Sequence, residues 1–545
     1  MNKPSFSRRD FLRLLGFGSG AVAFNSLISA CQPFLQNAPI VPTSTHLPPS
    51  IAAVTSTPHA PLEFSLRAVQ GEVSILSGAP TRVWQYQPTL ISGETSALQT
   101  LPGSYLGPIL HAWRGQTIRA RLENEISEPT ILHWHGLRIP EQADGHPRYA
   151  INTGETYDYE FPVLNRAGTY WIHPHPHQRT GAQAYYGMAG LFIVHDDEEQ
   201  AAGLPDGEFD IPLIIQDRMF DAQNQLVYLA SMMDSMTGFL GNVVLVNGQP
   251  NFTLPVAARP YRLRLLNGSN ARVYKLAFSD NTPLTVIATD GGLFAAPLQR
   301  NYVTLAPGER IELWIDFSRV GAGGRVKLVS LEFALGNGGM MGGGMSAGVP
   351  QGIPFDVMTF SVERDSADRP TLPSVLSAPN FYNAESAVNR NAPRRFEFAM
   401  QGMVGTINGM QFGMDDVTNY EAVKLGDLEF WEFANVAGGG MGMGMTLAPG
   451  ASAGVGGTAQ PHPIHVHGVQ FKIISRQIDR AYRNEYSTLS DGFVDDGWKD
   501  TVLVLPGETV QVLVQFEDYA GLYLYHCHNL EHEDGGMMRN YKVVS

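Results

Sequence analysis

The sequence predicts an all-β protein built from three consecutive β-sandwich domains, and three observations support this prediction. Glycine (57 residues) and proline (36) are both abundant, which favours short strands joined by turns over long helices. Two phrases recur three times, and each combines a glycine turn with apolar residues at every second position. A chain of 545 residues is also too long for one hydrophobic core, so the repeats indicate separate domains.

The two repeated phrases set the domain limits. The first runs from a glycine turn through an alternating strand to an asparagine, at 107–124, 247–267 and 407–435. The second is a Gly-Glu turn that enters a strand, in "TGETYDYEF" (153–161), "PGERIELWIDF" (307–317) and "PGETVQVLVQF" (506–516). From this spacing we expect domains at 61–200, 201–375 and 376–545.

The N-terminal stretch 1–31 has the pattern of an export signal. Arg8 and Arg9 precede an apolar run that is short and interrupted by glycines, which argues against a membrane-spanning helix. The pattern resembles a twin-arginine signal, so we expect a periplasmic or otherwise extracytoplasmic protein that is exported already folded. The run ends "LISAC", which resembles a bacterial lipobox. Two alternatives stay open: lipidation of Cys31, which would tether the chain to a membrane, or plain cleavage near Ala30.

Residues 32–60 are rich in proline, serine and threonine and predict a flexible linker. The net charge of −15 makes the chain a poor candidate for binding nucleic acid, whose phosphates require lysine and arginine. The chain has only two cysteines, and Cys31 lies in the signal. Cys527 therefore has no disulfide partner, and an exported protein that retains it is expected to use it for something else.

The histidines are clustered in a way that predicts a metal site. Random placement of 16 histidines would give about 0.5 His-x-His pairs, whereas the chain contains "HWH" (133–135), "HPHPH" (173–177), "HVH" (465–467) and "HCH" (526–528). Residues i and i+2 of a strand face the same side, so each pair directs two imidazoles one way. Four buried pairs could not all find ordinary partners. We therefore expect a metal cluster between the first and third domains. The middle domain has no histidine pair in its copy of the repeats, so we expect it to be a structural spacer.

In "HCH" the alternation puts Cys527 on the face opposite His526 and His528, so Cys527 belongs to a different site. A blue-copper centre needs two histidines, one cysteine thiolate and a weak axial methionine. His532 and Met537 follow Cys527 closely, and "HPIHVH" offers His462 outside its pair. The sequence thus predicts a mononuclear copper site linked to the cluster through the backbone of Cys527.

At these motifs the chain resembles the multicopper oxidases. "HWHG", "WIHPH", "HPIHVHG" and "HCHNLEHEDGGMM" are similar to the four signatures of that family and stand in its order, over nearly all of 61–545. The likeness is to bacterial three-domain laccases and cuprous oxidases. It implies cupredoxin-like Greek-key domains, four coppers, and oxidation of a reductant coupled to the four-electron reduction of O₂ to water, with a role in copper tolerance.

The resemblance also implies which residue holds which copper. Type 2 copper would be held by His133 and His465; one type 3 copper by His135, His173 and His528; the other type 3 copper by His175, His467 and His526. The family's Trp-x-His-x-His pattern, counted from Trp171, implies His173 and His175 as the ligands in this motif and leaves His177 spare.

Reduction of O₂ consumes four protons, which copper-bound imidazoles cannot deliver, so carboxylates are expected nearby. Glu533 directly follows His532, and Asp144 lies nine residues after His135. Both match positions where family members carry acids that relay protons or orient water. The alternative interpretation is that they are ordinary solvent-exposed acids.

Two glycine-rich stretches, 336–348 and 438–457, carry regularly spaced methionines, namely Met340, Met341, Met345, Met441, Met443 and Met445. Thioethers are soft ligands that select Cu(I), so these methionines are candidates for a Cu(I) relay to the type 1 copper. The alternative interpretation is a pair of low-complexity loops whose methionines bind nothing. Three alternatives stay open. The chain could be a general laccase acting on phenols, a non-enzymatic exported scaffold, or a copper carrier with the mononuclear site alone.

Overall fold

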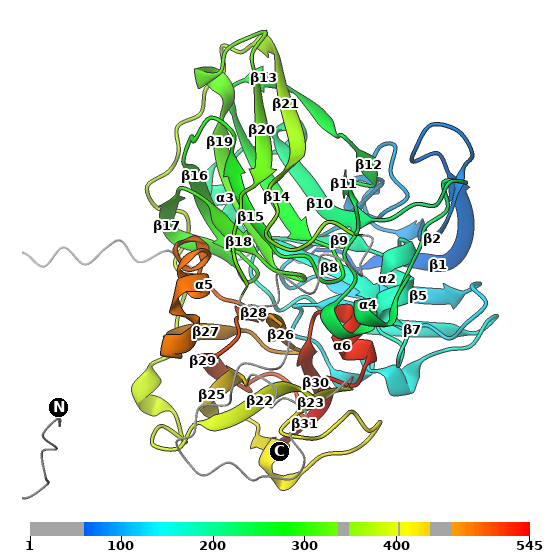
Figure 1. The fold of residues 1–545 in the computed structure, drawn as a ribbon, viewed down its shortest axis with the longest axis vertical. Helices are drawn as coiled ribbons and strands as arrows, with labels where there is room; N and C mark the ends of the chain where they lie inside the picture. The colour runs from blue at the N-terminus through cyan, green and yellow to red at the C-terminus, as the bar shows by residue number, and fades with distance from the viewer. Residues whose placement is uncertain (1–58, 336–347, 402–403, 437–459) are drawn as a thin grey trace, which may run out of the picture. The chain divides into compact units, whose positions relative to one another are not determined.

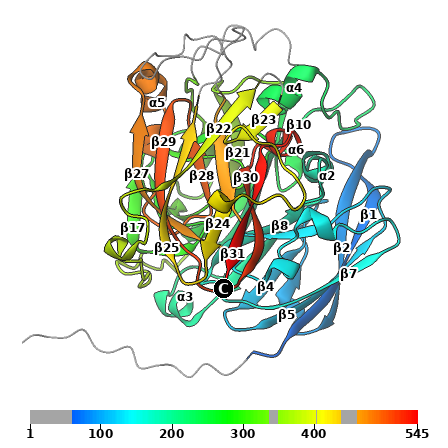
Figure 2. The same cartoon turned by 90° about the horizontal axis from the view of Figure 1, so that it is seen from below.

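The computed structural model describes residues 59–335, 348–401, 404–436 and 460–545. In this part of the chain the strands form six β-sheets, with few helices (Figures 1 and 2). Two sheets come from each of three stretches, 62–195, 210–365 and 394–544. The prediction of an all-β chain with three β-sandwiches is confirmed, and the domain limits given above remain a prediction. The signal at 1–31, with Cys31, and most of the linker lie outside the described residues.

The first sandwich shows why these residues form strands. Along β5, Ile118, Ala120 and Leu122 are buried while Arg119 and Arg121 between them are exposed, as the alternation predicts. Its sheets have the orders β2 (Thr81–Ser92), β1 (Leu62–Val73), β5 (Thr117–Asn124), β7 (Thr156–Pro162), and β3 (Leu98–Gln99), β4 (Ile109–Trp113), β9 (Gly190–His195), β8 (Gly168–Pro174), β6 (Leu132–His135).

In the middle sandwich, strand β14 is buried along its whole length. Arg262 and Arg264 on this strand are buried because they pair with Glu199, Asp210 and Glu312. Its sheets have the orders β12 (Gln249–Pro250), β11 (Val243–Val246), β10 (Asp210–Arg218), β14 (Pro260–Asn267), β19 (Arg310–Asp316), β16 (Leu284–Thr289), β17 (Gly292–Arg300), and β13 (Thr253–Ala258), β21 (Phe355–Asp365), β20 (Arg325–Ser330), β15 (Tyr274–Phe278), β18 (Val303–Leu305).

The third sandwich places β30 at the centre of a sheet, between β31 and β26. Its hydrophobic core contains Trp431, Phe433 and Phe471 together with Cys527 and Met537. Its sheets have the orders β23 (Val404–Ile407), β22 (Arg394–Gln401), β25 (Leu428–Asn435), β29 (Glu508–Gln515), β27 (Phe471–Ile478), and β24 (Ala422–Lys424), β31 (Met538–Val544), β30 (Gly521–Cys527), β26 (His462–Val466), β28 (Thr501–Val504).

Helices are short and few in the described chain. Besides short 3-10 turns, the α-helices are α2 (Thr180–Tyr186), α3 (Asp197–Ala202), α4 (Met232–Thr237), α5 (Arg483–Ser487) and α6 (Leu530–Asp534). Three of them gather where the stretches meet, since α6 lies beside both α2 and α4 (Figures 1 and 2). None of the helices described is long and apolar enough to cross a membrane.

Two acidic side chains on α6 fix its position. Asp534 accepts hydrogen bonds from the main-chain N–H groups of Thr180 and Gly181 on α2, both at 2.9 Å. Glu531 accepts one from the main chain of Phe239, just after α4, at 2.9 Å. These contacts hold the loop that follows Cys527 against the first and middle stretches.

Candidate metal centres

The paired histidines lie on, or immediately after, four adjacent strand ends. His133 and His135 are on β6 and face His173 and Trp171 on β8. His465 on β26 is paired with His526 on β30. His175, His467 and His528 follow directly after the ends of β8, β26 and β30. The eight side chains are buried, none being more than 1% exposed.

Pairs from the first and third stretches converge on one point. The Nε2 atoms of His133 and His465 are 3.3 Å apart, and those of His467 and His526 are 3.0 Å apart. His175 Nε2 lies 3.4 Å from His526 Nε2. His175, His467 and His526 have ligand atoms within 4.8 Å of one another, as a metal ion requires.

The remaining members of the cluster lie alongside. His133, His135 and His173 form a second group within 4.8 Å, and His133 forms a third with His465 and His467. The ring of His528 lies against those of His135 and His173, with centroids 5.0 Å and 5.3 Å away. The structure thus brings together all eight of the histidines that the pair motifs single out.

These imidazoles fit a group of metal cations. Among the eight imidazoles, five buried nitrogens have no hydrogen-bond partner in the described part of the chain: Nδ1 of His135, Nε2 of His173, Nδ1 of His175 and both nitrogens of His528. Burial lowers the pKa of His173, His175 and His528 to about 3, so the rings are neutral at pH 7. Neutral imidazole nitrogen is a preferred donor for copper and zinc.

Main-chain and carboxylate oxygens orient several of the rings. His133 Nδ1 donates to the main-chain oxygen of Asp144 (2.6 Å), and His467 Nδ1 donates to its carboxylate (2.8 Å). His465 Nδ1 donates to the main-chain oxygen of Asp500 (2.8 Å). Because the Nδ1 atom carries the proton in each case, Nε2 is left free to face the cluster.

A second donor set surrounds Cys527 on the opposite face of β30. Its Sγ lies 3.4 Å from Nδ1 of His462 and 3.6 Å from Nδ1 of His532. The three side chains are buried, and their ligand atoms lie within 4.8 Å of one another. Burial raises the pKa of the Cys527 thiol, so a bound cation is needed to hold it as thiolate.

Met537 is tied to the same loop. Its N–H donates to the main-chain oxygen of His532 (2.9 Å), and its oxygen accepts from the N–H of Cys527 (3.1 Å). Its side chain is fully buried in the cluster of apolar residues that contains Cys527. Two imidazoles, one thiolate and a nearby thioether are the donors of a blue-copper centre, so this set fits one copper ion.

The two predicted acids are both buried beside the imidazole cluster. Asp144 contacts His467 as described, and burial raises the pKa of Asp144 well above its ordinary value. The Glu533 carboxylate lies 3.2 Å from Nδ1 of His526 and 3.4 Å from Nε2 of His175. Neither acid is the solvent-exposed residue that the alternative interpretation required.

Sequence reasoning missed Asp500 and Thr501. The Asp500 carboxylate and the Thr501 hydroxyl each lie 3.1 Å from Nε2 of His135. Neither residue belongs to a histidine motif or an alternating pattern. Their proximity depends on a contact across 365 residues, which periodicity cannot reveal.

Helix α4 was also missed. The main-chain oxygen of Met236 accepts a hydrogen bond from Nε2 of His532 (3.0 Å), so α4 covers the outer edge of the mononuclear site. His177, the spare histidine, is exposed and its ring lies 5.2 Å from that of Phe412. The methionines proposed for a Cu(I) relay, at 340–345 and 441–445, lie outside the described residues.

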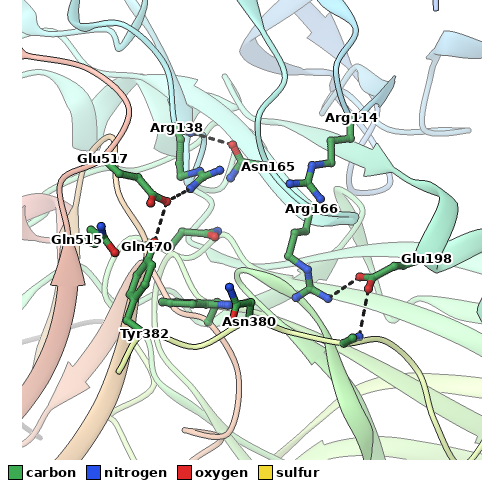
Figure 3. Close-up of a pocket in the computed structure, with 12 residues that line it drawn as sticks. Arg114, Arg138, Asn165, Arg166, Glu198, Asn380, Tyr382, Gln470, Gln515 and Glu517 are labelled. Carbon is green, nitrogen blue, oxygen red and sulfur yellow. Dashed lines mark hydrogen bonds and ion pairs between the residues drawn. The ribbon is translucent and has the colours of Figure 1, made fainter. Parts of the chain in front are cut away.

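A separate cavity of about 280 Å³ is lined by residues of the first and third stretches and of the segments that flank them (Figure 3). Arg138 donates to Glu517 (2.8 Å) and Arg166 to Glu198 (3.1 Å), while Arg114 reaches in from another side. None of the described residues that line it is a candidate ligand. Partly exposed ion pairs of this kind contribute little to stability, and we assign the cavity no part in the metal centres.

The fold and the two donor sets are those expected of a β-sandwich metalloprotein, with one thiolate-containing donor set and one separate imidazole cluster. Two family profiles, both described as multicopper oxidase, match residues 83–199 and 384–545. A multicopper oxidase from Staphylococcus haemolyticus is 31% identical over 81% of this chain and 83% of its own length. A laccase from Bacillus stratosphericus is 28% identical over 85% of this chain and 91% of its own.

A solved structure leads to the same family. The McoA multicopper oxidase from Aquifex aeolicus has a TM-score of 0.71 and 34% identity, covering 90% of this chain and 99% of that one. The chain belongs to the multicopper oxidase family. It is therefore a copper-dependent enzyme that oxidises a reducing substrate with O₂, and the prediction of cupredoxin-like sandwiches is confirmed.

Proposed function

We propose that this oxidase couples one-electron oxidation of Cu(I), with phenols as secondary substrates, to the four-electron reduction of O₂ to water, and that it serves copper tolerance. The observation that carries the proposal is the arrangement around β30. Cys527 lies in one donor set, and its chain neighbours His526 and His528 lie in the other. An electron that enters at the thiolate therefore has a route of only a few covalent bonds to the imidazole cluster.

The proposed ligands follow the assignment made from the motifs. Type 1 copper would be held by His462, Cys527, His532 and Met537; type 2 copper by His133 and His465; the two type 3 coppers by His135, His173 and His528, and by His175, His467 and His526. When bound, the four coppers would take electrons singly from the reductant and pass four of them to O₂, which with four protons gives two waters.

The protein's own residues would orient the ligands, exclude solvent and move protons. Asp144 holds the Nδ1 proton of His467, so that Nε2 faces the cluster. Glu533 places one carboxylate oxygen beside His526 and the other beside His175, and neither oxygen has a hydrogen-bond partner in the described part of the chain. We assign to Glu533 and Asp144 the transfer of protons to reduced oxygen. Glu533 is the one of the two that contacts His526 and His175.

Helix α4 supports the choice of a small reductant. His532 is 1% exposed, and its Nε2 is capped by the main-chain oxygen of Met236. Asn529 beside it donates to the main-chain oxygen of Thr237 (3.4 Å). A bulky phenol cannot stack on an imidazole edge that a helix covers, whereas a soft cation delivered by thioethers needs no such contact surface.

The metal content and visible absorbance of the copper-loaded wild-type chain test the proposal. Four coppers per chain, intense blue colour and O₂ uptake with Cu(I) are expected. One blue copper without O₂ uptake would indicate an electron carrier instead. A chain that binds no copper would be a non-enzymatic scaffold. If phenols are oxidised more efficiently than Cu(I), the protein is better described as a laccase.

Changing Met340, Met341, Met345, Met441, Met443 and Met445 to leucine tests the Cu(I) relay. Leucine keeps the apolar character but removes the sulfur, so kcat/KM for Cu(I) is expected to fall about tenfold, equivalent to ~1.4 kcal/mol. Steady-state oxidation of a phenol by the same variant is the internal control and should hold. Equal loss of both activities, or no loss for Cu(I), would contradict the relay.

We also propose an extracytoplasmic location, from the twin-arginine pattern and the "LISAC" sequence. A lipid on Cys31 would tether the chain to the membrane, and Cys31→Ser would then move the protein from the membrane fraction to the soluble one. An unchanged distribution would favour plain cleavage near Ala30.

A further inference from the structure

The Gly-Glu turn that recurs in the three sandwiches has one member that differs from the other two. In each copy the glutamate accepts a hydrogen bond at 2.7 Å from the main-chain N–H three residues earlier, which shows that the turn is the same. The residue after the glutamate is Thr156 in the first copy and Thr509 in the third, but Arg310 in the middle one. The turn itself therefore does not require an arginine.

Arg310 is fully buried and makes contacts with all three stretches. Its guanidinium forms a bidentate ion pair with Asp500, Nη1 to Oδ1 at 2.7 Å and Nη2 to Oδ2 at 2.6 Å. Its Nε donates to the main-chain oxygen of Thr169 in the first stretch (2.9 Å). Both members of the ion pair are 0% exposed.

Asp500 stands between Arg310 and the imidazole cluster. Its main-chain oxygen accepts the Nδ1 proton of His465 (2.8 Å), and its carboxylate lies 3.1 Å from Nε2 of His135. Arg310 is thus separated from two candidate ligands by a single residue. A partner at this position sets the orientation and tautomer of a ligand, which affects metal affinity.

The same turn touches the cluster a second time. Gly308 has φ of +82°, and a Cβ at that position would come within 3.1 Å of the ring of His528. A side chain there would be strained and would also press on a candidate ligand. The middle sandwich therefore packs directly against the cluster, at a position two residues before Arg310.

The far side of Arg310 is anchored as well. Its main-chain N–H donates to Asp290 (2.8 Å), and Asp290 pairs with Lys499 (3.0 Å), the residue before Asp500. Lys499 also pairs with Glu309 (2.9 Å). Buried ion pairs give up much of their attraction to desolvation, so a network of this size is weak evidence for stability alone. It does fix the position of each member.

We propose that Arg310 is a positioning residue for the multinuclear copper centre. It holds Asp500 in the place from which Asp500 directs Nε2 of His465 toward the metal, and so gives the middle sandwich a part in the centre beyond spacing its neighbours. This inference rests on the proposed function, since it concerns a centre that the chain is proposed to hold.

The test compares Arg310→Lys and Arg310→Met with matched changes at Arg262. Arg262 is also buried in the middle sandwich and pairs with Glu312 and Glu199, but it contacts none of the candidate ligands. Copper per chain, retention of copper against a chelator, and the EPR spectrum of the type 2 copper are measured for each loaded protein, together with Tm.

Both Arg310 variants are expected to hold the copper at His133 and His465 about 10- to 100-fold more weakly than wild type, with an altered EPR spectrum and unchanged blue colour. Lysine keeps the charge but not the two-pronged geometry, so Arg310→Lys is decisive if Arg310→Met does not fold. The Arg262 variants should lower Tm and leave the EPR spectrum unchanged.

Wild-type affinity and spectrum in Arg310→Lys would overturn the inference and leave the ion pair a purely structural one. The same would follow if the Arg262 variants altered the spectrum as much. A wild-type chain without a multinuclear copper centre would instead refute the proposed function, so the two failures are distinguishable.

Discussion

Replacing Cys527 with serine is expected to abolish the blue colour and reduce the oxidase turnover to background. Sγ of Cys527 lies 3.4 Å from Nδ1 of His462 and 3.6 Å from Nδ1 of His532. No other cysteine in the described part of the chain could supply a thiolate to this site. A serine hydroxyl is a harder ligand that does not ionise in this buried position. The variant thus loses the thiolate responsible for the strong absorption, together with the route for electrons.

Visible absorbance, copper content and O₂ uptake with Cu(I) are measured on the loaded variant. Copper at the imidazole cluster should remain, because Cys527 faces away from it. Cys31→Ser is the matched control, since it removes the only other cysteine and should stay blue and active. A Cys527→Ser protein that remained blue would remove Cys527 from the site.

Glu533→Gln is expected to slow the reoxidation of the fully reduced enzyme by O₂ about 100-fold, within the range typical of lost proton transfer. The amide has nearly the shape of the carboxylate but cannot accept and deliver a proton in the same way. Because Glu533 is not one of the proposed ligands, copper content and blue colour should stay near wild type. Single-turnover reoxidation followed by stopped-flow absorbance isolates this step from the oxidation of the substrate.

Glu531→Gln provides the control for Glu533. Glu531 is on the same helix and equally buried, but its oxygens are occupied by Tyr228, Asn270 and the main chain of Phe239. Its replacement should lower Tm and leave reoxidation unchanged. If both variants slowed reoxidation equally, the effect would reflect displacement of α6, and the assignment of Glu533 as a proton carrier would not stand.

Local periodicity is enough to predict much of this protein. The alternation of strands correctly separates Cys527 from its two histidine neighbours, and the structure places them in different donor sets. The phrases that begin with a glycine turn predict β-sandwiches because turns and alternation are properties of adjacent residues. The assignment of His133 and His465 to the same copper goes beyond what local spacing can predict. It follows from the family resemblance.

Contacts between distant segments could not be predicted. Arg310 meets Asp500 across 190 residues, and Met236 meets His532 across 296. Neither contact has a local signal, since arginine after a Gly-Glu turn and methionine on a short helix are both compatible with an exposed position. The oxygen of Met236 acts through the main chain, so its role does not depend on residue type at all.

The central position of β30 has a consequence for anyone who alters this enzyme by insertion or deletion. His526 is paired with His465 on one side and with Met538 on the other, so the strand is aligned from both edges. Moving it by one residue would send the thiol to the imidazole face and both imidazoles to the thiol's face. An insertion or deletion within β30 therefore puts both donor sets of the enzyme at risk together.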